Sequence, residues 1–97
     1  MATYISLINY TDQGIRNVKD SPKRLDAAKK ALKDLGGELK AFYLTMGAYD
    51  IVIVAEAPSD EVVARFVLAV GSLGNVRTTT LKAFNEAEFR KIVGALP

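Results

Sequence analysis

Residues 51–55 constrain the fold more than any other part of this chain. They carry five consecutive apolar side chains, flanked by Asp50 and Glu56. Because successive side chains of a β-strand point to opposite faces of its sheet, a strand here presents apolar groups on both faces, with Val52 and Val54 on the second one. The helices of one small domain cover a single face. We therefore expect a second copy of the chain to cover the other.

Hydrophobic spacing and turn residues divide the chain into seven expected elements. Short β-branched and aromatic runs predict strands, apolar residues three and four apart predict helices, and glycine or proline marks their ends. The expected strands are residues 3–10, 38–45, 50–57 and 76–84, and the expected helices begin with caps at Ser21, Ser59 and Asn85. The polar residues 11–14 are expected only to end the first strand. The last helix is expected to bury Phe89, Ile92, Val93 and Leu96.

The order strand, helix, strand, strand, helix, strand, helix is that of an α+β, ferredoxin-like βαββαβ domain with an added C-terminal helix. Its four strands would form one antiparallel sheet, with the two long helices on one face. No linker or low-complexity stretch interrupts the 97 residues. A single domain over residues 1–97 is therefore expected.

The composition excludes several classes of site. Histidine and cysteine are both absent, so zinc sites built from them, Ser-His-Asp triads and thiolate nucleophiles cannot form. We expect no metal and no cofactor. Residues 14–40 hold eight Lys or Arg against four Asp or Glu, which predicts a solvated basic helix face and no nucleic-acid partner, because no nucleic-acid motif accompanies the charge. Without a signal peptide or an apolar stretch of roughly 18 residues, a cytoplasmic protein that does not enter membranes is expected.

The turn at residues 46–50 is the strongest candidate for a site. It combines Gly47, which can take a positive φ angle, with the hydroxyl of Tyr49 and the carboxylate of Asp50. Tyr49 and Asp50 could serve as an acid–base pair if burial raised the pKa of the carboxyl group. The structural alternative is a hairpin turn in which Asp50 accepts backbone N–H groups.

A second candidate follows the helix that begins after Ser59. Residues 71–75 could form an anion-binding nest with Arg77 close by, or simply the turn that ends the helix. Arg77 could instead pair with Asp50 or Glu56 of the same or another chain. The candidate ligand-binding residues are thus Gly47, Tyr49, Asp50 and Arg77.

The residues of both candidates also carry a family resemblance. Gly47, Tyr49 and Asp50, followed by residues 56–58 and 71–78, resemble the GYD domain family over nearly the whole chain. The resemblance implies the dimeric α/β barrel group, whose ferredoxin-like chains pair sheet to sheet. It implies no activity and no catalytic residue.

The expected function is therefore that of a homo-oligomeric domain that binds a small molecule or an anion near this turn. A cofactor-independent isomerase or oxygenase that uses Tyr49 and Asp50 as an acid–base pair is the alternative.

Overall fold

The computed structural model describes all 97 residues and contains every expected element, with two additions. The strands are Ala2–Tyr10 (β1), Glu38–Leu44 (β2), Ile51–Ala57 (β3) and Val76–Ala83 (β4). The helices are Asp12–Arg16 (α1), Ser21–Asp34 (α2), Asp60–Ser72 (α3) and Glu86–Gly94 (α4), with a short 3-10 helix at Val18–Asp20 (η1). The additions are α1 and η1, which lie between β1 and α2.

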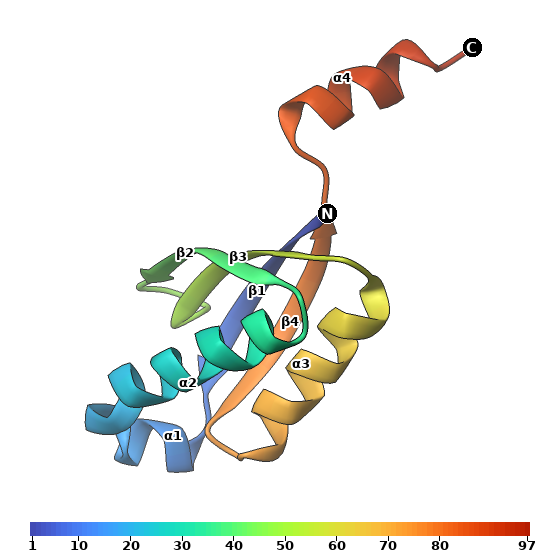
Figure 1. The fold of residues 1–97 in the computed structure, drawn as a ribbon. Helices are drawn as coiled ribbons and strands as arrows, with labels where there is room; N and C mark the ends of the chain where they lie inside the picture. The colour runs from blue at the N-terminus through green and yellow to red at the C-terminus, as the bar shows by residue number, and fades with distance from the viewer.

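The four strands form one antiparallel sheet in the order β2-β3-β1-β4. Both α2 and α3 lie on the same face of this sheet (Figure 1). The predicted ferredoxin-like arrangement is thus confirmed. No helix has the length and apolar character needed to cross a membrane.

The covered face carries the core of the chain. Alternate residues of β3, beginning with Ile51 and Ile53, are buried there, and Leu32 of α2 is 1% exposed against them. Phe66 of α3 closes the same cluster. The predicted division of strand three is confirmed, because Val52 and Val54 lie between the buried positions and point to the other face.

We call that other face of the sheet the open face, because no element of the chain covers it. Strand register places a continuous apolar patch on it: Ile5, Leu7, Ala41, Tyr43, Val52, Val54 and Leu81. Tyr43 is 60% and Leu81 48% exposed. Contiguous apolar surfaces are uncommon on small monomeric proteins.

The region after β1 differs from the expectation of a simple strand end. Thr11 caps α1, since its hydroxyl oxygen accepts the Gly14 N–H at 3.1 Å. The hydroxyl also donates to the Gly74 carbonyl oxygen at 2.6 Å, which ties α1 to the loop before β4. Gly14 approaches that loop so closely that a Cβ atom would lie 1.9 Å from the Asn75 carbonyl oxygen. Contacts distant in sequence therefore hold α1 against the loop before β4.

Two further predictions about helices were wrong. The residue before α2 is Asp20, and Ser21 is the first residue of the helix, where its hydroxyl bonds to Tyr10. The last helix has the predicted capping box between Asn85 and Glu88, but it has no buried residue. It projects beyond the end of β4 and away from the sheet, so its apolar side is exposed (Figure 1).

A hydrogen-bonded group joins the start of α3 to the sheet. Tyr4 donates its hydroxyl proton to Asp60, which also pairs with Lys82 at 3.2 Å. The hydrogen bond from Tyr4, and then Lys82, lower the pKa of Asp60 below its ordinary value. The same bond to Asp60, and then burial, raise the pKa of Tyr4.

These shifts predict a loss of stability at both ends of the pH range. A carboxyl group whose pKa is lower in the folded state stabilises the fold above its unfolded pKa of about 3.9, and this contribution is lost as pH falls. The contribution of Tyr4 is present below pH about 10 and is lost as pH rises further. Urea unfolding across pH should therefore show a smaller acid-side decline for Asp60→Asn than for the unchanged chain. The control Asp26→Asn should leave that decline unchanged, and equal declines for all three would contradict the prediction.

Candidate functional site

A large apolar cleft lies between the covered face of the sheet and the helices. Its volume is about 860 Å³, and 19 of its 26 lining residues are hydrophobic. The cleft exists because α2 turns small side chains toward it: Ala27, Ala28 and Ala31. Ligand sites in proteins typically have this size and apolar character, with a few polar groups that orient the ligand.

The polar groups of the cleft include a linked set at the start of α2. The hydroxyl groups of Tyr10 and Ser21 are 2.8 Å apart, and Arg24 Nη2 donates to the Ser21 oxygen at 3.0 Å. Arg24 is half-buried and forms no ion pair with a carboxylate. Its remaining bonds go to the carbonyl oxygens of Asn17 and Gly14. The guanidinium charge beside the cleft is thus available to an anionic group.

Asp50 also lines this cleft. Its Oδ2 atom accepts the Tyr10 N–H at 2.9 Å, and its own N–H donates to the Ile8 carbonyl oxygen at 2.9 Å. Asp50 thus accepts a backbone N–H, as in the structural alternative, but the donor belongs to β1 and not to the hairpin turn. The bond holds the end of β1 against the start of β3.

Gly47 and Tyr49 belong to the hairpin turn outside the cleft lining. Gly47 has a φ angle of +137°, and no atom lies within 4 Å of a Cβ placed on it. The Thr45 hydroxyl donates to the Tyr49 carbonyl oxygen at 2.6 Å, and the Thr45 N–H to the Asp50 carbonyl oxygen at 2.8 Å. The turn is shaped by these backbone contacts, and the side chain of Tyr49 is half-buried.

Arg77 lies on the opposite side of the sheet from the cleft. Its neighbours in β4, Val76 and Thr78, line the cleft, so alternation turns Arg77 to the open face, in register with Asn9. It forms no ion pair with Asp50 or Glu56. The structure thus separates Arg77 from Asp50, and a ligand-binding role for either stays a prediction.

The loop at residues 71–75 is occupied by contacts with α1. Its carbonyl oxygens accept bonds from Thr11, as described above, and from the Gln13 side chain, which donates to Leu73 at 3.1 Å. Gly74 takes a φ angle of +83° as the helix ends. These contacts support the helix-terminating alternative for the loop, and the nest stays a prediction.

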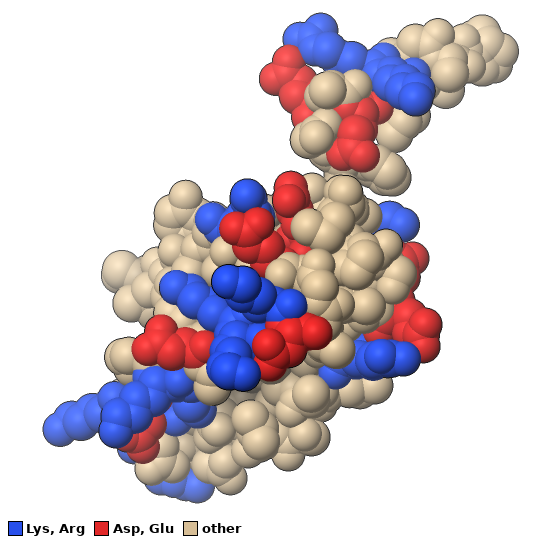
Figure 2. Space-filling model, in the orientation of Figure 1, with Lys and Arg blue, Asp and Glu red and all other residues tan.

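Ser21 and Arg24 are residues of the site that sequence reasoning missed. Arg24 is one of many basic residues on α2, which mix with acidic ones on the surface shown in Figure 2. The only sequence signal for this pair is the spacing of three residues between Ser21 and Arg24, since residues three apart on a helix share a side. That spacing would have placed Arg24 beside Ser21.

The chain is a ferredoxin-like α+β domain. Its helices cover one face of the sheet and leave a cleft there, and the open face is exposed. The GYD domain model matches residues 4–93, and the chain belongs to the GYD domain family. The predicted resemblance is thus confirmed.

One curated relative and two solved structures extend this comparison. The chain is 37% identical over 89 residues to the glutamine synthetase and cystathionine beta-lyase binding protein of Thermus thermophilus, covering 91% of this chain and 94% of that one. A crystal structure of a Thermus thermophilus protein matches with a TM-score of 0.56 and 28% identity, over 88% and 95% of the two chains. A feast or famine regulatory protein from M. tuberculosis, complexed with L-methionine, matches with a TM-score of 0.66 at 18% identity. That match covers 88% of this chain and 51% of the regulator, and at 18% identity it shows the fold alone.

Proposed function

We propose that this chain is a non-catalytic, self-associating binding module of the cytoplasm. The apolar open face carries this proposal. Only 12 of the 97 residues are buried in the single chain, which is a small core, whereas the open face holds a contiguous apolar patch. Pairing two such faces would remove the patch from water and add to the stability of both copies.

The mass in solution tests self-association directly. One chain has a mass of 10.5 kDa, so light scattering at micromolar concentration should give at least twice that mass. A strict monomer would contradict the proposal. The absence of cysteine is consistent with the reducing cytoplasm that we propose.

We further propose that the cleft binds an apolar molecule that carries an acidic group. The apolar lining would take the hydrocarbon part, and Arg24 with the hydroxyl groups of Tyr10 and Ser21 would take the acidic group. Asp50 lies in the same lining and would favour a hydroxyl or ammonium group on the ligand beside it. Gly47 and Tyr49 would act indirectly, by shaping the turn that positions Asp50.

Filling the cleft should weaken this binding. Ala31→Leu adds volume to the cleft wall, so we expect it to weaken the binding of decanoate by about tenfold or more in titration calorimetry. Arg24→Gln should weaken it as well by removing the charge. The matched control Ala64→Leu changes an exposed position of α3 outside the lining and should bind decanoate normally. Equal affinities for all variants would place the probe elsewhere and contradict the cleft as the site.

A second candidate function is an adaptor that binds a metabolic enzyme. The 37% identical relative, named for binding glutamine synthetase and cystathionine beta-lyase, favours it. Gel filtration of the chain with each purified enzyme should then show co-elution. Separate elution with both enzymes at micromolar concentration would argue against this function.

An acid–base role for Tyr49 and Asp50 has less geometric support. Asp50 accepts the Tyr10 N–H, and Tyr49 accepts the hydroxyl proton of Thr45 through its backbone carbonyl oxygen. An enzymatic role stays a prediction of the sequence. Unchanged turnover of an identified substrate by Tyr49→Phe and Asp50→Asn would exclude it.

A further inference from the structure

The C-terminal helix carries an apolar side that nothing in its own chain covers. We call residues 84–96 the arm. Its apolar side chains are 46% to 65% exposed: Phe84, Phe89, Ile92, Val93 and Leu96. Figure 1 shows the arm extending past the end of β4, and the long dimension of the molecule is 51 Å. An isolated helix of nine residues is unstable in water, so packing must stabilise α4.

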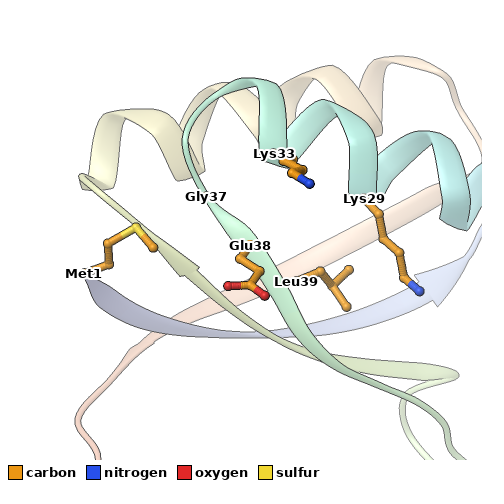
Figure 3. A pocket seen from close by; sticks show the side chains of 6 residues that line it. All are labelled: Met1, Lys29, Lys33, Gly37, Glu38 and Leu39. Carbon is orange, nitrogen blue, oxygen red and sulfur yellow. The ribbon is translucent and has the colours of Figure 1, made fainter.

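We propose that the arm is exchanged between two copies of the chain, so that α4 of each copy packs into a hollow at the start of β2 of the other. This inference rests on the self-association proposed above and adds the surface and the contact. The hollow has a volume of about 390 Å³. Its lining residues are Met1, Lys29, Lys33, Gly37, Glu38 and Leu39 (Figure 3).

The strand register places the arm and the hollow at the same end of the sheet. Glu38 pairs with Glu56, Glu56 with Thr3, and Thr3 with Ala83, where the arm begins. This row crosses the sheet from β2 at one edge to β4 at the other. The arm and the hollow therefore lie on opposite edges of one chain, but at the same level along the strands.

A two-fold axis parallel to the strands brings these two features together. When two sheets face each other across such an axis, β4 of one copy lies beside β2 of the other, and the strand directions are kept. The arm then begins next to the partner's hollow, and the same contact occurs twice. In this arrangement each arm lies against the partner's β2, which is one of the two free edges of that sheet, and covering a free edge lowers the tendency to aggregate.

The arm is poorly placed to cover the open face of its own chain. Four strands span roughly 19 Å at about 4.8 Å each, whereas a helix with its side chains is about 10 Å wide. Folding back would therefore leave about half of the face exposed. A second sheet covers all of it and leaves the arm outside, at the edge.

Charge also favours the pairing of arm and hollow. Lys29 and Lys33 extend beside the start of β2, and neither belongs to an ion pair (Figure 3). The first turn of α4 carries Glu86 and Glu88. The acidic turn is the part of the helix nearest the sheet, so it would meet the two lysines. Glu38 of the same lining pairs with Lys40 at 3.6 Å, which leaves the positive charge of the two lysines in excess.

The area is sufficient for a stable contact. Covering the five apolar side chains would remove on the order of 500 Å² per arm from water. Two arms together with the surfaces that they cover would bury roughly the 1,600 Å² of a standard interface. The area buried between the two open faces would come in addition.

Cysteine trapping tests the exchange, because the chain has no cysteine of its own. The double variant Lys33→Cys with Phe89→Cys is expected to form a covalent dimer in mild oxidant at micromolar concentration. A matched control combines Phe89→Cys with Arg65→Cys on α3, and each single variant is a further control. Phe89→Ser with Ile92→Ser should weaken the wild-type dimer by about 30-fold or more in sedimentation equilibrium.

The outcomes separate this inference from the proposed function. A covalent dimer specific to Lys33 supports the exchanged arm, and equal trapping through Arg65 contradicts it. A trapped monomer with an internal disulfide shows that the arm folds onto its own chain and overturns the exchange. An untrapped dimer that survives the serine substitutions also overturns the exchange but leaves sheet pairing intact. A monomeric wild-type chain overturns both proposals.

Discussion

Replacing Val54 with aspartate is expected to convert the self-associated protein into a folded monomer. Val54 lies at the centre of the open face, between Ile5 of β1 and Ala41 of β2 in the strand register. In a sheet-to-sheet pair the new carboxylate would be buried without a partner in both copies. An uncompensated buried charge costs about 3 to 5 kcal/mol, which corresponds to at least a hundredfold weaker association.

The single chain should tolerate this substitution, because Val54 is only half-buried within it and the carboxylate can reach water. Sedimentation velocity would measure the mass, and circular dichroism would confirm that helices and strands remain. Leu68→Asp is the matched control, since Leu68 is 73% exposed on α3 and lies off the open face. If Val54→Asp kept the wild-type mass, the open face would not be the pairing surface.

Replacing Leu32 with alanine is expected to cause the largest loss of stability within the chain. Leu32 is 1% exposed and is the only large side chain that is fully buried. It packs in the cluster with Ile53 and Phe66, and its side chain lies under Gly37, at 2.8 Å from a Cβ placed there. Removing it would leave a cavity and lower the free energy of unfolding by about 2 to 5 kcal/mol. That is a large share of the roughly 5 to 15 kcal/mol of a typical domain.

Urea unfolding would measure this loss. The protein concentration must be the same for all variants, because association stabilises the folded state by mass action. Leu68→Ala is the control and should change the unfolding free energy by no more than about 0.5 kcal/mol. A loss below about 1 kcal/mol for Leu32→Ala would mean that neighbouring side chains refill the space.

Most of the fold could be predicted because its signals are local. Apolar spacing, proline and glycine positions and the caps at Ser59 and Asn85 lie within a few residues of each element. The short helix α1 could not be predicted in the same way. It depends on bonds from Thr11 to the loop at Gly74 and on the close approach of Gly14 to Asn75, which are about 60 residues apart in the chain.

The candidate site was predictable only in part. Asp50 was found because a carboxylate at the start of an apolar strand is unusual, and the structure places it in the cleft lining. Ser21 and Arg24 were missed because their partner Tyr10 belongs to another element. Arg77 was grouped with Asp50 by its charge, but strand alternation turns it to the other face.

By itself, the sequence determined the order of the four strands and of α2, α3 and α4, the antiparallel sheet, and the presence of apolar side chains on both faces of β3. These follow from periodicity, which each segment carries in its own residues. Only the tertiary structure decided that small residues of α2 leave a cleft, which groups surround it, and that α4 packs on nothing in its own chain. These features depend on distances between side chains far apart in the sequence, and no local pattern of residues encodes such distances.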